Sequence, residues 1–346
     1  MSEKSLYVGI DIGGTWVRVV LAEESSILIK VSSKTVKSGL VNALPTQVIN
    51  LIKIALKETN RSIKEIKSIG TSSAGPFIKG ELIHAPNICG VDNDWEVIPY
   101  IPELRSFFGP DVELKMENDC VAAVKAEHTF GAARGIKDAV YITISTGIGA
   151  GLISDNRLIF GKGHNAGHFG HMIVKKDGDL CGCGQRGCIE TIASGKNIER
   201  RAKGAGFKWN NGDEYTAKEV FEAYRNNDPI AKAIIQETLE YLSIFLINVI
   251  NITDTSMIIL GGSVMKNADI IIPFVQEYIT NNSIASISEG VQFKLAELGD
   301  WVGDLGGLSL VLPEEIQKKW VEIKPWTHEK KEKYLTVGEA MNPNLE

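Results

Sequence analysis

Residues 6–22 have the sequence LYVGIDIGGTWVRVVLA, and this stretch decides the expected fold. A short apolar run over residues 6–10 ends at Asp11, a glycine-rich turn follows at residues 13–15, and a second apolar run covers residues 16–22. Two apolar runs on either side of a short glycine turn are typical of two strands joined by a tight turn. The chain is therefore predicted to begin with a strand, a turn and a strand.

The same layout returns near the middle of the chain. Residues 139–154, AVYITISTGIGAGLIS, predict a strand up to Ser145, a glycine turn over residues 146–151 and a strand that resumes at residue 152. A third apolar run, residues 257–260, leads into a further pair of glycines at 261 and 262. Repetition of one local unit suggests internal duplication. We therefore expect a duplicated α/β domain built around a cleft.

Local patterns place further elements between the first two glycine turns. Residues 45–60 carry apolar side chains at helical spacing, and residues 68–73 form an apolar run that predicts a strand. Residues 84–99 are rich in Pro, Gly and Asn, which predicts a loop.

Composition limits the kinds of protein that the chain can be. Its 346 residues are enough for two domains, and 44% hydrophobic with 23% charged residues is ordinary for a soluble globular protein. The net charge of −6 argues against a general nucleic-acid-binding surface. The apolar stretch at residues 241–252 is too short to span a bilayer and predicts a buried core helix, so no membrane partner is expected. Residues 1–14 show no secretion signal, which predicts a cytoplasmic protein.

The first two glycine turns are candidate phosphate-binding sites. Glycines allow backbone N–H groups to approach a phosphate closely, and the hydroxyl groups of Thr15 and Thr146 add donors. Asp11, at the end of the first strand, is placed to hold a hydrated magnesium ion on the phosphates. A glycine turn also occurs in ordinary hairpins, and the chain lacks the P-loop pattern. The second turn has the spacing Gly147-x-Gly149-x-Gly151 and a strand is expected after it, whereas a dinucleotide-binding site has G-x-G-x-x-G between a strand and a helix. Two such turns, the first opened by Asp11, favour nucleotide binding.

Three of the five cysteines gather in residues 164–190, HNAGHFGHMIVKKDGDLCGCGQRGCIE. Cys181, Cys183 and Cys188 are separated by glycines, and His171 stands ten positions before the first of them. Three thiolates and one imidazole form the closed tetrahedral shell of a structural zinc ion. Disulfides or free thiols are the alternative, although disulfide frameworks belong mainly to small secreted chains.

A candidate general base stands in Glu117-Asn118-Asp119. These residues follow the apolar Val112 and Leu114 and precede a predicted helix, so Asp119 is expected at a strand end or a helix start. Phosphoryl transfer needs a group that accepts the proton of the acceptor hydroxyl, and a positioned carboxylate that does so is worth about 10²–10⁴ in rate. The alternative is that Asn118 or Asp119 only caps the helix.

Taken together, these motifs resemble those of the ROK family of sugar kinases and repressors, within the actin/hexokinase-like ATPase superfamily. The resemblance covers roughly residues 6–310. The matching pieces occur in order: DIGGT at 11–15, END at 117–119, STGIGAG at 145–151, GH at 170–171, CGCGQRGCIE at 181–190 and GGS at 261–263.

The resemblance implies a two-domain α/β fold of the actin-like ATPase, or ribonuclease H-like, type, with a structural zinc loop and a C-terminal extension. The small N-terminal domain would cover residues 1–120, and the large C-terminal domain would cover residues 121–303 and contain the zinc loop at 164–190. A helix over residues 304–311 would return to the N-terminal domain.

The remaining residues, 312–346, form a charged and proline-broken tail. The tail contains Trp320, Trp326 and Tyr334. It either docks on the body through these aromatic side chains or is disordered, and the composition fits both alternatives.

The resemblance also implies how ATP and a sugar would be bound. ATP would lie between the two domains, which would close over the substrates, and Asp119 would be the base that activates the sugar 6-hydroxyl. Zinc would be structural and would fix the loop that carries Glu190. The implied residues are Gly13, Gly14, Thr15, Thr146 and Gly147 for the phosphates; Gly261 and Gly262 for adenosine; Gly75, Asn87, Asn118, His171 and Glu190 for the sugar ring; and His171, Cys181, Cys183 and Cys188 for zinc.

The same family contains DNA-binding repressors that carry an extra N-terminal winged helix. The phosphate turn opens at Asp11 in this chain, which leaves no room for that module and predicts an enzyme without a nucleic-acid partner. A regulator that binds a sugar without catalysis is disfavoured because Asp11 and Asp119 are both present. Relatives are commonly dimers or tetramers, so a homo-oligomer is expected.

One position departs from the family pattern. The usual motif before the metal histidine is Glu-x-Gly-His, and here it is His168-Phe169-Gly170-His171. The family glutamate accepts hydrogen bonds at the C1–C2 edge of the sugar, whereas a neutral imidazole offers one donor and one acceptor. A donor there suits a 2-acetamido carbonyl, which favours an N-acetylhexosamine, in particular N-acetylmannosamine. The alternative is that His168 still accepts a hydroxyl hydrogen bond and the sugar is glucose.

Overall fold

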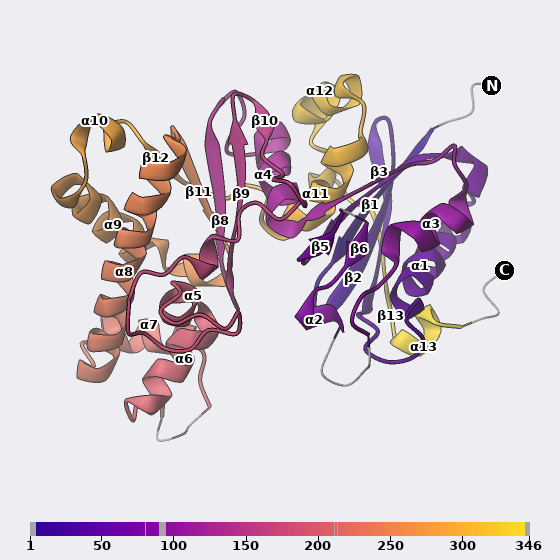
Figure 1. Ribbon diagram of the computed structural model, residues 1–346. Coiled ribbons are helices and arrows are strands. Elements are labelled where there is room, and N and C mark those ends of the chain that lie inside the picture. The colour runs from indigo at the N-terminus through magenta and orange to yellow at the C-terminus, as the bar shows by residue number, and fades with distance from the viewer. Residues whose placement is uncertain (1–4, 80, 90–94, 211, 213, 343–346) are drawn as a thin grey trace. The chain divides into compact units, whose positions relative to one another are not determined.

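The computed structural model describes residues 5–79, 81–89, 95–210, 212 and 214–342. The chain forms two compact units, each with its own sheet and hydrophobic core (Figure 1). Unit 1 consists of Met1–Arg134, Leu158–Ala166 and Leu298–Glu346, and unit 2 consists of Gly135–Arg157 and Gly167–Glu297. Both units combine a mixed sheet with helices, so the expected α/β class is confirmed.

Unit 1 is built on a six-stranded sheet in the order β13-β3-β2-β1-β4-β7. The β1–β2 and β2–β3 pairs are antiparallel, whereas β4 with β1, β7 with β4 and β13 with β3 are parallel. The strands are β1 Leu6–Ile12, β2 Trp16–Glu23, β3 Ser26–Lys34, β4 Ile66–Ser73, β7 Glu113–Asn118 and β13 Lys331–Leu335. The central strands β1 and β4 are buried almost throughout, because helices cover the sheet on both faces.

The helices of unit 1 pack on opposite faces of this sheet (Figure 1). The even-numbered side chains of β1 join the core that includes α1, while its odd-numbered positions face α11. The expected helix over residues 45–60 is present as α1. The helices are α1 Ala43–Thr59, α2 Pro86–Cys89, α3 Tyr100–Phe108, α4 Asp119–Phe130, α11 Val302–Val311, α12 Glu314–Ile323 and α13 Val337–Ala340, with 3-10 turns at Ile63–Glu65, Gly299–Trp301 and Pro325–Thr327 and a small hairpin of β5 Phe77–Ile78 and β6 Leu82–Ile83.

Helix α11 approaches the sheet closely because glycines line the contact. A Cβ atom added to Gly9 would lie 2.5 Å from Leu308 Cγ, and one added to Gly70 would lie 2.0 Å from the carbonyl oxygen of Gly307. Larger residues at Gly9 and Gly70 would therefore push the helix away. Helix α4 packs against α11, and the first segment of unit 1 therefore extends to Arg134. The domain boundary expected after residue 120 lies inside α4.

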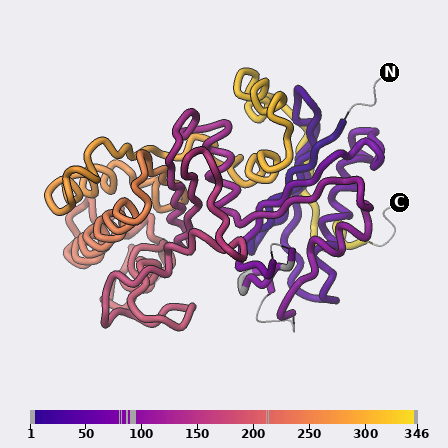
Figure 2. The backbone as a smooth tube through the Cα atoms, turned by 45° about the horizontal axis from the view of Figure 1, so that its top comes forward, coloured from indigo at the N-terminus to yellow at the C-terminus, as the bar shows by residue number. Residues whose placement is uncertain are grey.

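The C-terminal tail is ordered into helices and a strand up to residue 342, the last residue that the structure describes. Trp320 is fully buried and donates its indole N–H to the carbonyl oxygen of Glu24 at 3.0 Å. Trp326 packs against Phe130 with ring centroids 5.4 Å apart. Strand β13, yellow in Figure 2, extends the sheet beside β3. The tail therefore docks on unit 1, which is one of the two alternatives expected from the sequence.

Unit 2 repeats the strand layout of unit 1. Its sheet has the order β10-β9-β8-β11-β12, and the corresponding order in unit 1, without the tail strand, is β3-β2-β1-β4-β7. β8 and β9 are antiparallel, whereas β11 is parallel to both β8 and β12. The elements are β8 Ala139–Ile144, β9 Ile148–Ser154, β10 Arg157–Leu158, β11 Met257–Gly261, β12 Gln292–Leu295, α5 Glu190–Ala193, α6 Gly195–Gly204, α7 Ala217–Arg225, α8 Pro229–Thr253, α9 Ala268–Asn282 and α10 Ala285–Ser288, with 3-10 turns at Phe169–His171 and Ser263–Asn267. Both units thus contain the predicted strand–turn–strand hairpin.

The second glycine turn is shorter than the sequence predicted. Only residues 145–147 lie outside the strands, and β9 begins at Ile148. Gly149 and Gly151 belong to this strand, where they pair with Thr143 and Tyr141 of β8. A glycine in a strand and a glycine in a turn look alike in sequence, and here the pairing with β8 decides between them.

Helix α8 is long and apolar enough to cross a membrane by length and composition alone. Half of its most apolar window is nevertheless buried (50%). Phe245, Leu246 and Val249 are fully buried in the core of unit 2. The core helix predicted from residues 241–252 is thus present, but it begins earlier, at Pro229, so the expectation that it is too short to span a bilayer was wrong.

Candidate active site and cysteine cluster

Asp119 is the first residue of α4 and follows directly on β7. The backbone N–H of Cys120 donates to Asn118 Oδ1 at 3.0 Å and to Asp119 Oδ1 at 2.8 Å, so Asn118 does cap the helix. The Asp119 side chain is exposed, yet desolvation by the surrounding protein, with the negative charge of Asp11, raises the pKa of its carboxyl group to about 6. Asp119 is therefore an ionised carboxylate at neutral pH that binds a proton more tightly than an ordinary aspartate does.

One further predicted residue, Gly75, lies at this corner of unit 1. A Cβ atom added to Gly75 would lie 3.3 Å from Asn118 Nδ2, so Gly75 and Asn118 are in contact. Glu117 is 7% exposed, and both of its carboxylate oxygens lie near His164 Nδ1, at 3.0 and 3.2 Å. The backbone of Asn87 belongs to α2, and its side chain lies outside the described part of the structure.

The first glycine turn is closed by backbone contacts of unit 1. Gly13 donates its N–H to the carbonyl oxygen of Trp16 at 2.9 Å. The hydroxyl group of Thr35 donates to the Gly13 carbonyl oxygen at 2.7 Å, and the Thr35 N–H donates to the Thr15 carbonyl oxygen at 3.0 Å. Thr15 itself is exposed at the tip of the turn, as a phosphate-binding hydroxyl requires.

Asp11 lies beside this turn in a cluster of charged side chains. Arg18 donates to Asp11 Oδ2 at 2.7 Å, and a Cβ atom added to Gly303 would lie 2.5 Å from Asp11 Cγ. Lys30 forms a buried ion pair with Asp304 on α11. Burial raises the pKa of Asp11, and Arg18 opposes that shift. Burial also raises the pKa of Asp304 to about 6 despite the positive charge of Lys30.

Sequence reasoning missed Arg18, Lys30 and Asp304. Lys30 and Asp304 are separated by 274 positions, so no local pattern joins them. The one available signal was an aspartate within the otherwise apolar run of residues 302–311.

The second glycine turn in unit 2 contacts the end of the cysteine loop. Glu190 Oε2 accepts the backbone N–H of Ile148 at 2.9 Å, and a Cβ atom added to Gly147 would lie 2.6 Å from the same oxygen. Glu190 was expected to bind the sugar ring, and its carboxylate also holds the second glycine turn. This second contact could not be read from the sequence, because it depends on how the loop folds back.

The third glycine pair lies against the same turn. Gly262 has φ of +92°, and a Cβ atom there would lie 2.4 Å from the carbonyl oxygen of Ile144. The hydroxyl groups of Ser145 and Ser263 lie 3.2 Å apart. Unit 2 therefore brings together the residues predicted for phosphate, Thr146 and Gly147, and those predicted for adenosine, Gly261 and Gly262.

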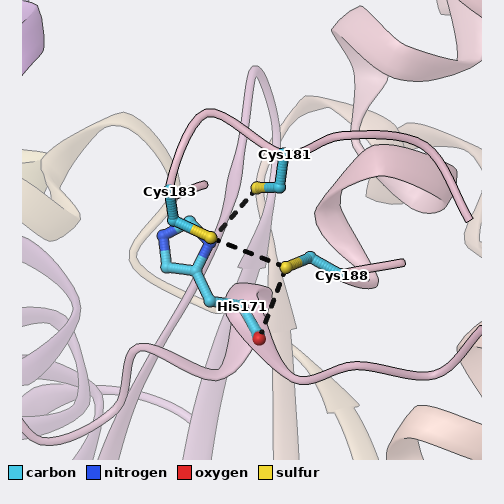
Figure 3. A group of neighbouring side chains, drawn as sticks. All are labelled: His171, Cys181, Cys183 and Cys188. Carbon is cyan, nitrogen blue, oxygen red and sulfur yellow. Dashed lines mark hydrogen bonds between the residues drawn. The ribbon is translucent and has the colours of Figure 1, made fainter. Parts of the chain in front are cut away.

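The cysteine cluster brings four possible metal ligands close together. The ligand atoms of His171, Cys181, Cys183 and Cys188 all lie within 4.8 Å of one another, and their side chains point toward a common centre (Figure 3). Cys181 Sγ lies 3.5 Å from His171 Nδ1, and Cys183 Sγ lies 3.7 Å from Cys188 Sγ. In a tetrahedron with bonds of about 2.3 Å the ligands are about 3.7 Å apart. The donor set and its spacing thus fit zinc, and the cysteines are free rather than disulfide-bonded.

His168 stands next to this cluster. Its ring is exposed and lies roughly parallel to that of His171, with centroids 6.2 Å apart. The His171 ring turns Nδ1 toward Cys181, and Nε2 is then left for another partner. Unit 2 therefore presents His168, His171 and Glu190, the predicted sugar residues of this unit, around one loop.

Comparison with known proteins decides the family. Residues 7–314 match the ROK family. The chain belongs to the ROK family. The assignment made from the glycine turns, the END triplet and the cysteine loop is therefore confirmed.

The named relatives of this chain include sugar kinases of two kinds. A glucokinase of Halalkalibacterium halodurans is 27% identical over 323 residues, which cover 89% of this chain and 96% of the relative. An N-acetylmannosamine kinase of Pasteurella multocida is 27% identical over 274 residues, which cover 79% of this chain and 86% of the relative. A crystal structure of a ROK family glucokinase from Streptomyces griseus in complex with glucose and AMPPNP is 28% identical, with a TM-score of 0.68 over 89% of this chain and 99% of that chain.

Proposed function

We propose that this protein is an ATP- and magnesium-dependent kinase that transfers the γ-phosphate to the 6-hydroxyl of an N-acetylhexosamine, in particular N-acetylmannosamine. The observation that carries the proposal is Asp119 at the start of α4, beside Asn118 and Gly75, in a ROK chain. Sugar kinases of both the glucokinase and the N-acetylmannosamine kinase type are among its relatives.

Asp119 acts as the general base. Its carboxylate accepts the proton of the sugar 6-hydroxyl while that oxygen attacks the γ-phosphorus in line with the departing ADP oxygen. A pKa of about 6 keeps the group ionised at neutral pH and makes it a stronger base than an ordinary aspartate. The capped helix start holds the carboxylate in one place, which reduces the entropy lost in the transition state.

The glycine turns hold the nucleotide. Gly13, Gly14, Thr15, Thr146 and Gly147 offer backbone N–H and hydroxyl donors to the phosphates, and Gly261 and Gly262 leave room for the adenosine. Asp11 fits a hydrated magnesium ion, because it is a carboxylate at a strand end and Arg18 engages only its Oδ2. Magnesium, when bound, neutralises charge on the β- and γ-phosphates.

The cysteine cluster would hold a structural zinc ion. His171, Cys181, Cys183 and Cys188 would bind it, and a closed four-ligand shell has no open position for a substrate. The chain's own contribution is to fix Glu190 and the His171 ring. With Nδ1 of His171 toward the metal, Nε2 faces away from the metal and is the atom that would contact a sugar hydroxyl.

His168 favours an acetamido sugar. Its exposed imidazole offers a donor where ROK proteins usually carry an acceptor-only glutamate, and the carbonyl oxygen of a 2-acetamido group accepts such a bond. Glucokinase activity is the second candidate, and it is favoured by the glucokinases among the relatives. A sugar-binding regulator without catalysis is the weakest of the three, because Asp11 and Asp119 are both present.

A sugar panel tests the proposal. We would measure kcat/KM with ATP for glucose, N-acetylglucosamine and N-acetylmannosamine, and identify the phosphorylated position by NMR. N-acetylmannosamine is expected to be preferred, and a preference for glucose of about tenfold or more would overturn the substrate assignment. His168→Glu is expected to move the preference toward glucose, and an unchanged ratio would show that His168 does not select the sugar.

The assembly and location are proposed from the family alone. We propose a homo-oligomer, a dimer or a tetramer, in the cytoplasm, with no nucleic-acid or membrane partner. Light scattering of the purified protein measures its mass and so tests whether it is a dimer or a tetramer.

A further inference from the structure

We propose that His164 and Asn165 form a clamp that positions the sugar-binding corner of unit 1, so that both are positioning residues for phosphoryl transfer. The two residues are adjacent in the segment Leu158–Ala166 of unit 1. Each holds a different element of that unit, and both elements carry residues assigned to the sugar or to the base. The inference rests on the proposed function and adds two residues to it.

Asn165 holds the loop that carries Gly75. Its Oδ1 accepts the backbone N–H of Phe77 at 2.9 Å, and its Nδ2 donates to the carbonyl oxygen of the same residue at 3.0 Å. The amide therefore engages both backbone groups of Phe77, as a neighbouring strand would. A third bond, from Nδ2 to the Gly163 carbonyl oxygen at 2.7 Å, fixes the amide itself.

His164 holds the strand end that carries the base. Its Nδ1 lies 3.0 and 3.2 Å from the two carboxylate oxygens of Glu117, which is followed directly by Asn118 and Asp119. Glu117 is 7% exposed, and a buried carboxylate needs hydrogen-bond donors to offset the loss of water. His164 supplies one such donor, and the ring of Phe160 packs against its imidazole at 5.2 Å.

The backbone at His164 also marks a constrained position. Its φ of +58° lies in the left-handed region, which few residues other than glycine adopt. Residues held in this region concentrate at functional sites, where the surrounding structure maintains them. Here the conformation allows two successive side chains to bond to Glu117 and to Phe77.

The two held elements meet at Gly75. A Cβ atom added there would lie 3.3 Å from Asn118 Nδ2 and 3.8 Å from Asn165 Oδ1. One short segment therefore sets the spacing between the Gly75 loop and the Asn118–Asp119 corner. Small displacements between such groups have large effects on rate, because the acceptor hydroxyl must be aligned with both.

The clamp is tested with matched variants. Asn165→Asp keeps the size and the acceptor but removes the donor to Phe77, and His164→Ala removes the contact to Glu117. His164→Gln retains an N–H donor, and Lys162→Ala changes an exposed neighbour in the same segment. For each variant we would measure sugar Kd by calorimetry, kcat, the KM values for sugar and ATP, and the melting temperature.

We expect Asn165→Asp and His164→Ala to weaken sugar binding and to lower kcat, each by about five- to tenfold, while the KM for ATP changes less than about twofold. His164→Gln should recover much of the loss, and Lys162→Ala should behave as the unaltered protein does. Unchanged sugar Kd and kcat in folded Asn165→Asp would overturn the inference, and so would equal losses for sugar and ATP that only follow the melting temperature. If the unaltered protein bound and phosphorylated no sugar of the panel, the proposed function itself would fail, and that result is separate from any effect of the variants.

Discussion

The carboxylate of Glu190 accepts a hydrogen bond from the backbone N–H of Ile148 at 2.9 Å. This bond joins the end of the cysteine loop to the second glycine turn within unit 2. The residue expected to contact the sugar therefore also maintains the turn expected to contact phosphate. The Glu190 side chain thus connects the proposed sugar site with the proposed phosphate site of unit 2.

Glu190→Ala is accordingly expected to impair both substrates. The Ile148 N–H is buried, and a buried donor left without a partner costs about 1–3 kcal/mol, or roughly 5- to 150-fold in affinity. The KM for ATP should rise together with the KM for the sugar. Glu190→Gln keeps an acceptor oxygen and should affect mainly the sugar. Steady-state kinetics separates these cases, and an unaltered KM for ATP in Glu190→Ala would show that the contact has no role in nucleotide binding.

The cysteine cluster is expected to contain about one zinc ion per chain, measured by plasma mass spectrometry. Cys183→Ser should lose the metal, lower the melting temperature and weaken sugar binding, because His171 and Glu190 lose their support. Structural zinc contributes on the order of 10 kcal/mol in small peptides, and the independent core of unit 2 should keep part of the fold here. Cys89→Ala, at a buried cysteine of unit 1, is the matched control and should retain zinc. Full sugar affinity in metal-free protein would contradict the structural role.

Gly303→Ala is expected to disturb Asp11. The added Cβ atom would lie 2.5–2.7 Å from the atoms of the Asp11 carboxylate, so the carboxylate must move. We expect weaker binding of magnesium-ADP, measured by calorimetry, and lower kcat/KM for ATP. Gly204→Ala is the control, because it meets open space near the end of a helix and should leave binding intact or raise stability by roughly 0.5–1 kcal/mol. Equal nucleotide affinity in the two variants would argue against a role of Asp11 in binding the magnesium ion and the phosphates of the nucleotide.

The pH dependence of kcat/KM is expected to reflect the ionisation of Asp119. Asp119 acts in its ionised form, and its raised pKa moves the acidic limb of kcat/KM from near pH 4 to about pH 6. The rate should therefore be level above about pH 7 and fall about tenfold per unit below pH 6. Asp304 also has a pKa of about 6, so the profile should be repeated with Asp304→Asn. An inflection that disappears in that variant would assign the limb to Asp304 instead.

Much of the fold was predictable because it is encoded locally. The hairpin β1–β2, helix α1 and the start of α4 each follow from apolar spacing, glycine turns or a capping residue within a few positions. The cysteine cluster was equally readable, since its ligands lie within residues 171–188.

The remaining features depend on contacts between distant residues. The Lys30–Asp304 pair and the bonds from Asn165 to Phe77 join segments that are remote in sequence. The division into compact units could not be read from the sequence for the same reason, because α4 packs against the distant α11. The length of the second glycine turn was set by pairing with β8, which the glycines themselves do not reveal.

The variant Asp119→Asn tests whether Asp119 is the general base. This variant keeps the size of the side chain and the acceptor for the Cys120 N–H, but amide nitrogen and oxygen cannot take up the proton of the sugar hydroxyl. Single-turnover phosphorylation and sugar Kd should be measured on the same preparation, with the sugar that the panel selects. We expect a rate lower by about 10²–10⁴, with sugar Kd changed by less than about threefold. Turnover within a few-fold of the unaltered protein would contradict the assignment of Asp119 as the base.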